Sequence, residues 1–300
     1  MVATESELDL AHVGATASGL AHPGSDAPLG VYLQRLWDLR HFAWSHARGS
    51  VRASTSTSLL GELWLLLEPA LLIAIYFIIF GVVIRADRGV DNFVAFLAIG
   101  QIIFTHSRRG ILETGGSLLQ RGPMLRTFAF PKAILPLSAT MRTIVTHAVG
   151  LVAMMVFVLA AGVSPRVGWL LVPFLSVAQA LMNLGIGLFL ARFLVTTDDL
   201  GRLLSYVFRL ALYGSGVLFS VDAYLEEFAR GDLFLKLMLF NPLFIYIELN
   251  RWIIMGREPS NSGLMLVAAA IWTFGSLALG FWWFRRSERK YTGFGKVISL

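Results

Sequence analysis

The sequence predicts an all-α membrane protein with six transmembrane helices, an N-terminal amphipathic helix at the membrane interface, and short helices between the fifth and sixth spans. Its 300 residues are 56% hydrophobic and 15% charged, with a mean hydropathy of +0.68. Soluble chains are about 45–50% apolar and about 25% charged. The apolar residues also gather in stretches near the roughly 20 residues that cross a bilayer. These observations exclude most classes of soluble enzyme.

Net charge and cysteine content exclude further classes of protein and of binding site. The formal charge is +6, but the cations lie beside apolar spans, where they act as orientation signals rather than as a nucleic-acid surface. The absence of cysteine from the sequence excludes disulfides, iron–sulfur clusters and thiolate zinc sites.

The N-terminal part divides into two segments. Residues 1–30 are small, polar and without an apolar run, which predicts a disordered tail and no secretory signal peptide. Residues 31–58 predict an amphipathic interface helix over 31–45 followed by a linker, because aromatic and aliphatic residues fall on one helical stripe. Packing of this helix on a partner subunit is the alternative interpretation.

The transmembrane domain is expected over residues 59–300. The predicted spans cover about 63–84, 92–112, 142–161, 167–190, 203–219 and 263–284. The second span crosses the membrane only if it continues past Arg108 and Arg109. Between the fifth and sixth spans, Asn241-Pro242 is typical of a helix N-cap followed by proline in the first helical position, and predicts a helix through Trp252.

The distribution of cations predicts that both ends of the chain are cytoplasmic. Most of the 25 Lys and Arg residues fall in segments 31–62, 107–142, 191–202 and 285–300. Cytoplasmic loops carry such an excess of positive charge.

Motifs for catalysis are missing from the sequence. It contains no GxxxxGK[ST], HExxH or GxSxG pattern, so ATP hydrolysis through a P-loop is excluded. The six histidines have no metal-ligand spacing on one helix, and no metal site is predicted. His147 is interpreted as a hydrogen-bonded packing residue.

Two ionisable residues, Glu68 and Arg209, lie inside predicted spans, where charge is costly and suggests function. Both fall near the inner membrane boundary, so one hypothesis pairs them. The alternative is that Arg209 extends to the lipid headgroups and Glu68 is protonated or solvated.

The segment Glu113–Arg142 is cationic and interrupted by Gly and Pro. It is suited either to docking on another protein or to binding anionic lipid headgroups.

Several segments in order resemble the membrane subunit of ABC-2 type exporters, in the polysaccharide (O-antigen, teichoic acid, galactan) branch. The resemblance covers roughly residues 31–290. It is carried by Leu60-Gly61-Glu62-Leu63-Trp64, Leu67-Glu68-Pro69, Tyr76-Phe77-Ile78-Ile79-Phe80-Gly81, Arg126-Thr127-Phe128-Ala129-Phe130-Pro131-Lys132, Leu135-Pro136-Leu137-Ser138, and Asn241-Pro242-Leu243 with Glu248 and Arg251. The segment Leu119-Gln120-Arg121-Gly122 departs from the family's Asn-rich turn.

The resemblance implies a half-transporter in the bacterial cytoplasmic (inner) membrane. Two copies of this chain would form the pore, and two copies of a separate ABC ATPase would bind ATP and Mg²⁺, with no cofactor on this chain. The substrate would be a glycan on a polyprenyl pyrophosphate carrier. Residues 114–130 would hold the coupling helix, and 221–256 the external gate helices. The coupling contact would fall on Gln120, Arg121, Gly122, Pro123 and Arg126.

Candidate substrate residues follow from the chemistry of that cargo. A pyrophosphate needs cationic donors near the inner leaflet, and Arg48, Arg52, Arg108 and Arg109 are the candidates. Sugar C–H faces stack on aromatic rings, so Tyr76, Tyr206, Tyr213 and Phe219 are the candidates for lining the pore. An ABC-2 exporter of drugs or small lipids, an integral-membrane glycosyl- or acyltransferase, and a scaffold or channel are the alternatives.

Overall fold

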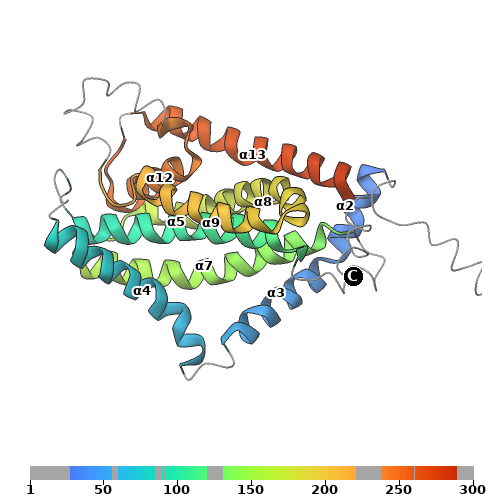
Figure 1. Ribbon diagram of the computed structural model, residues 1–300. Coiled ribbons are helices and arrows are strands. Elements are labelled where there is room, and N and C mark those ends of the chain that lie inside the picture. Colours follow the sequence, from blue (N-terminus) through green and yellow to red (C-terminus); the bar gives the residue numbers. More distant parts are fainter. Residues whose placement is uncertain are drawn as a thin grey trace, which may run out of the picture.

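The computed structural model describes residues 28–55, 60–84, 90, 92–119, 131–220, 238–259 and 261–288 (Figure 1). In chain order the elements are α2 (Leu29–Asp38), α3 (Arg40–Thr55), η1 (Gly61–Leu63), α4 (Trp64–Tyr76), the π-helix η2 (Phe77–Val83), α5 (Phe93–Gly116), α7 (Ile134–Ala160), η4 (Val167–Leu171), α8 (Val172–Thr196), α9 (Asp198–Gly214), α12 (Pro242–Met255) and α13 (Ser262–Ser287). Every regular element in these ranges is helical, which confirms the all-α prediction.

Four helical segments among the described residues are long and apolar enough to cross a membrane. They are Trp64–Val83, Ile134–Ala160, Val167–Thr196 and Ser262–Ser287. They correspond to the first, third, fourth and sixth expected spans, so the count of six is not confirmed. The expected second span is α5, which carries Arg108 and Arg109. The expected fifth span is α9, whose 17 residues extend about 25 Å, less than the roughly 30 Å hydrocarbon core.

The boundaries of two spans differ from expectation. Helix α7 begins at Ile134 rather than near residue 142, because Pro136 lies in its first turn, where a missing N–H costs no helical hydrogen bond. Helix α9 ends at Gly214 rather than near residue 219.

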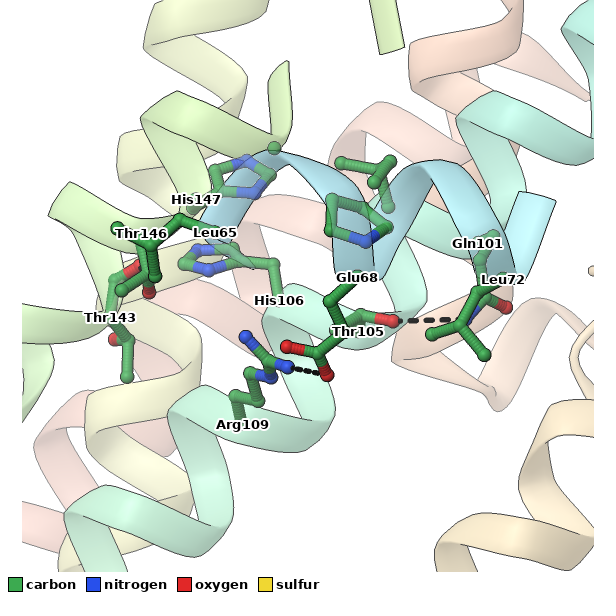
Figure 2. Close-up of a pocket in the computed structure, with 13 residues that line it drawn as sticks. Leu65, Glu68, Leu72, Gln101, Thr105, His106, Arg109, Thr143, Thr146 and His147 are labelled. Atoms are coloured by element: carbon green, nitrogen blue, oxygen red, sulfur yellow. Dashed lines mark hydrogen bonds and ion pairs between the residues drawn. The ribbon is translucent and has the colours of Figure 1, made fainter. Parts of the chain in front are cut away.

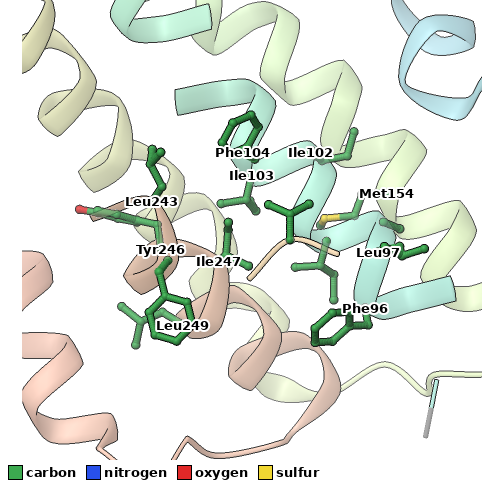
Figure 3. Close-up of a cluster of buried hydrophobic side chains, with 14 of the residues drawn as sticks. Phe96, Leu97, Ile102, Ile103, Phe104, Met154, Leu243, Tyr246, Ile247 and Leu249 are labelled. Atoms are coloured by element: carbon green, nitrogen blue, oxygen red, sulfur yellow. The ribbon is translucent and has the colours of Figure 1, made fainter. Parts of the chain in front are cut away.

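Helix α5 lies at the centre of the bundle, packed between α7 and α8 (Figure 1). Helix α13 packs along α8, α12 crosses one end of α5, and α4 lies at the periphery. The main hydrophobic core, part of which Figure 3 shows, joins α5 to α12 and includes Phe96, Ile103, Met154 and Ile247. The middle of α5 is therefore surrounded by neighbouring helices rather than by lipid.

The interface of α8 and α13 depends on two glycines. A Cβ built on Gly280 would lie 1.9 Å from the carbonyl oxygen of Gly185, and one built on Gly185 would lie 2.3 Å from the carbonyl carbon of Ser276. Any side chain at either position would therefore push the backbones apart, as at other close helix crossings in membrane proteins.

The expected N-terminal helix is present but is longer and is broken at Leu39 into α2 and α3. Ser50–Thr55, expected to be linker, is helical, since Val51 is buried and the Ser54 hydroxyl donates to the Val51 carbonyl (2.7 Å). Trp37 and Trp44 are exposed to the outside of the bundle. The Arg40 guanidinium stacks over the Trp37 ring and the Arg48 guanidinium over the Trp44 ring. The expected disordered tail lies, except for residues 28–30, outside the described residues.

The N-cap predicted for the helix before the last span is confirmed. The Asn241 side-chain oxygen accepts from the Leu243 N–H (3.0 Å), and Pro242 occupies the first turn of α12. The helix continues past Trp252 to Met255, where Gly256 with φ of 79° ends it.

Candidate functional site

A pocket lined by both polar and apolar side chains lies where α4, α5 and α7 meet (Figure 2). Glu68 and Pro69 line it from α4, Gln101 and Thr105 from α5, and Thr143 from α7. The space open to water inside it is about 40 Å³, which is room for a few water molecules. The pocket is therefore large enough to hold water between otherwise apolar helices.

Glu68 forms an ion pair with Arg109 of α5, and Figure 2 shows this pair at the pocket wall. The hypothesis that Glu68 pairs with Arg209 is therefore wrong within the described chain. Helix α4 packs on α5, which brings Arg109 to the carboxylate, whereas Arg209 is exposed on α9 with its guanidinium 5.3 Å from the Tyr206 ring centroid.

Two histidines stack at one side of the pocket. The rings of His106 and His147 lie 3.8 Å apart with an interplanar angle of 15°. His147 Nε2 is 3.2 Å from the Ser176 hydroxyl, so the interpretation of His147 as a hydrogen-bonded packing residue is confirmed. Among the described residues, no three His, Cys, Asp or Glu side chains gather in a metal-binding group.

The four arginines predicted to bind pyrophosphate lie on two elements. Arg48 and Arg52 occupy the exposed face of α3, while Arg108 and Arg109 lie on α5 and are half-buried. Arg108 interacts electrostatically with Glu68, Tyr76 and Arg209, which come from α4 and α9. The structure thus adds Arg209 to the arginines around Arg108.

Three of the four aromatic residues predicted to line the pore lie in the same part of the bundle. Tyr206 and Tyr213 are exposed on α9, and Tyr76 of α4 interacts electrostatically with Tyr213. The fourth, Phe219, is half-buried and packs against the main core. We call Tyr76, Arg108, Tyr206, Arg209 and Tyr213 the tyrosine–arginine face.

Sequence analysis named Arg251 but did not predict its contacts with other elements. Its guanidinium donates to the carbonyl oxygens of Gly216 (2.8 Å), Val217 (3.1 Å) and Phe96 (3.2 Å), and to Glu248 (2.6 Å). It is 2% exposed. The motif with Glu248 marked the residue, but its spacing gives no sign of the partners on other elements.

A second polar cluster lies at the end of the bundle where α2 meets the end of α13. The Glu288 carboxylate accepts from the Lys132 backbone N–H (2.8 Å), and Lys132 Nζ donates to the Glu288 carbonyl oxygen (3.0 Å). The buried Tyr32 of α2 faces the same carboxylate. Burial raises the pKa of the Glu288 carboxyl, lowers that of the Lys132 ammonium and raises that of the Tyr32 hydroxyl.

The predicted coupling residues Gln120, Arg121, Gly122, Pro123 and Arg126 lie outside the described residues. The chain is described up to Leu119 and again from Pro131. The predicted external gate is described from Met238 onward.

Comparisons with known proteins find similarity to O-antigen export permeases. No family model matches the chain. An O-antigen export system permease protein RfbA of Klebsiella pneumoniae is 24% identical over 188 residues, 62% of this chain and 70% of that protein. Its namesake from Myxococcus xanthus is 26% identical over 198 residues, 66% of this chain and 75% of that protein.

These similarities confirm the resemblance found in the sequence. The matched residues make up more than 60% of this chain and at least 70% of each relative. This chain is therefore a relative of the ABC-2 type O-antigen exporter permeases.

Proposed function

We propose that this chain is the membrane-spanning subunit of an ATP-driven ABC exporter that moves a polyprenyl-pyrophosphate-linked polysaccharide from the cytoplasmic to the outer face of the inner membrane. Its similarity to O-antigen export system permeases over 188–198 residues carries the proposal. Two copies of the chain form the pore. Two copies of a separate ATPase supply ATP hydrolysis with Mg²⁺, and this chain itself acts as a transport subunit without a cofactor.

The meeting of the two described ends of the chain supports the proposed orientation. Tyr32 of α2 packs edge-on against Phe281 of α13, with ring centroids 5.9 Å apart, and the Arg285 guanidinium lies over the Tyr32 ring. The two described ends therefore lie on one side of the bundle, where an even number of spans would bring them. In the proposal α5 and α9 are the second and fifth of six, and the arginine-rich ends face the cytoplasm.

The tyrosine–arginine face supports a polyanionic, sugar-bearing cargo. Tyrosine offers a flat apolar ring for sugar C–H faces and a hydroxyl for their oxygens. Arg108 and Arg209 supply the planar donors that bind phosphate oxygens in pairs. A face that carries both chemistries suits a glycan joined to pyrophosphate better than a purely apolar drug.

The proposal is tested by ATP hydrolysis of a purified complex. The chain is co-expressed with a candidate ATPase, reconstituted in vesicles, and supplied with lipid-linked glycan or with a hydrophobic drug. Co-purification and stimulation by the glycan are the expected results. Stimulation by the drug alone assigns the chain to the drug and small-lipid exporters, and failure of any ATPase to co-purify contradicts the ABC mechanism.

A matched pair of variants tests the cargo contact. Arg108→Gln is expected to raise the glycan concentration for half-maximal stimulation about tenfold, as for loss of a charge-assisted hydrogen bond. Arg202→Gln is the control, because Arg202 lies on α9 but is 83% exposed and pairs only at the surface with Asp199. Equal responses of the two variants would remove Arg108 from the cargo site.

A further inference from the structure

Tyr32, Lys132 and Glu288 bring together three parts of the chain that are far apart in sequence. Tyr32 belongs to α2, Lys132 comes two residues before α7, and Glu288 follows the last residue of α13. We call these three residues the three-way junction. In Figure 1 the end of α13 lies beside α2, at the end of the bundle from which α7 also starts.

The bonds of the junction are reciprocal. The Glu288 side chain accepts from the Lys132 backbone, and the Lys132 side chain donates to the Glu288 backbone. Each residue therefore fixes the other's main chain and not merely its side chain. The two hydrogen bonds thus link the backbone at Lys132 to the backbone at the end of α13.

The surroundings of the junction are tightly packed. Glu288 is 1% exposed and Lys132 is 8% exposed, although charged residues are seldom buried to this extent. Tyr32 belongs to a second hydrophobic cluster that also contains Leu135, Leu188 and Phe284. Buried polar bonds beside such a cluster restrict how the three elements move relative to one another.

Tyr32 joins α2 to the same carboxylate. The Tyr32 hydroxyl and the Glu288 carboxylate are both buried, and the two side chains interact electrostatically. A buried polar group gains most from a partner, so this contact links α2 to the end of α13.

A further contact extends the junction to α3. The Ser138 hydroxyl, in the second turn of α7, donates to the Ala43 carbonyl oxygen (3.1 Å), and His46 Nδ1 lies 2.6 Å from the same hydroxyl. The start of α7 is therefore held on α3 as well as on the end of α13.

We propose that the three-way junction transmits movement of the chain at Lys132 to α2 and α13, so that Tyr32, Lys132 and Glu288 are positioning residues for transport. The inference rests on the proposed function. Residues 120–130, which contain the predicted ATPase contact, lead directly into Pro131 and Lys132. Displacement of that segment by the ATPase then acts on the junction through Lys132, as it acts on α5 through Leu119.

The test compares ATP hydrolysis with glycan transport in the reconstituted complex. Glu288→Ala removes the acceptor for the Lys132 N–H, and Lys132→Met removes the donor to Glu288. Each is expected to lower the glycan transported per ATP about tenfold while hydrolysis changes by less than about twofold. Glu288→Gln is expected to restore most of the ratio, because its amide oxygen still accepts from Lys132.

Arg286→Gln is the matched control, since Arg286 lies in the last turn of the same helix but is exposed. Unchanged transport per ATP in Glu288→Ala and Lys132→Met overturns the inference. So does a parallel fall of transport, hydrolysis and thermal midpoint, which would show a structural role alone. If the wild-type chain binds no ATPase, the proposed function itself fails, before any variant is compared, and the junction's role in coupling falls with it.

Discussion

The guanidinium of Arg251 lies 3.3 Å from the centroid of the Phe96 ring and thereby ties α12 to the first turn of α5. The same group donates to Gly216 and Val217, in the turn that follows α9. One side chain thus connects three elements that the sequence places far apart. The close approach also explains Gly100, where a Cβ would lie 2.7 Å from Arg251 Nη2.

Replacing Arg251 is expected to destabilise the bundle strongly. Arg251→Met leaves several buried carbonyl oxygens and the Glu248 carboxylate without their donor, which costs about 3–5 kcal/mol in the free energy of unfolding. Arg251→Lys is expected to recover only part of this, because an ammonium cannot match the planar guanidinium. Unfolding in detergent measures the change, and the exposed Arg257→Met is the control. A loss below about 1 kcal/mol for Arg251→Met would contradict the structural role.

A single methyl group is expected to separate α8 from α13. Gly280→Ala places a carbon where the Gly185 carbonyl oxygen lies, and overpacking of this kind costs about 1–3 kcal/mol or more. Gly275→Ala, on the same helix, has nothing within 4 Å of the new Cβ and is expected to be neutral or to stabilise by about 0.5–1 kcal/mol. Thermal unfolding of the two variants checks this, and similar midpoints would show that the helices do not approach closely.

The partner of Glu68 can be identified by a double-mutant cycle. Glu68→Gln and Arg109→Gln are expected to be non-additive by about 0.5–1 kcal/mol, a modest value because both side chains are partly exposed. Glu68→Gln and Arg209→Gln are expected to add. The free energy of unfolding of the single and double variants is the measurement, and coupling to Arg209 instead would restore the original hypothesis.

Stability is expected to depend on the ionisation of Glu288. Its carboxyl pKa is raised above the ordinary value of 4.5 by burial. Between the ordinary and the raised value the folded chain holds a proton that the unfolded chain has released. The free energy of unfolding therefore falls as the pH rises through this window. Thermal midpoints between about pH 4 and pH 7 are expected to fall less steeply with pH for Glu288→Gln than for the wild type, because the amide does not titrate there.

Composition and hydropathy were sufficient to predict the helical membrane fold, because the apolar runs of α4, α7, α8 and α13 are local properties of the chain. Asn241-Pro242 likewise predicted the start of α12, since an N-cap acts on its own neighbours. The second and fifth spans were harder to predict. Helix α5 is covered by other helices rather than by lipid, and its arginines weaken the apolar signal.

The candidate site was predicted only in part, for a different reason. The residues Glu68, Arg109 and Arg209 were recognised as unusual, but which charges meet depends on how each helix is rotated about its axis. A residue's position in the sequence does not give that rotation. The three-way junction had no local signal, because Lys132 and Glu288 are 156 positions apart.

The outward face of α4 and Gly280 of α13 differ in how well they tolerate substitution. In the spanning segment Trp64–Val83 only 6% of the most apolar stretch is buried inside the chain, so exchange of one outward aliphatic residue for another there removes few intramolecular contacts. At Gly280 of α13, a change as small as glycine to alanine meets backbone atoms of α8. Random mutagenesis should therefore yield abundant neutral variation in the first segment and almost none at Gly280, an imbalance that deep sequencing of surviving clones would reveal.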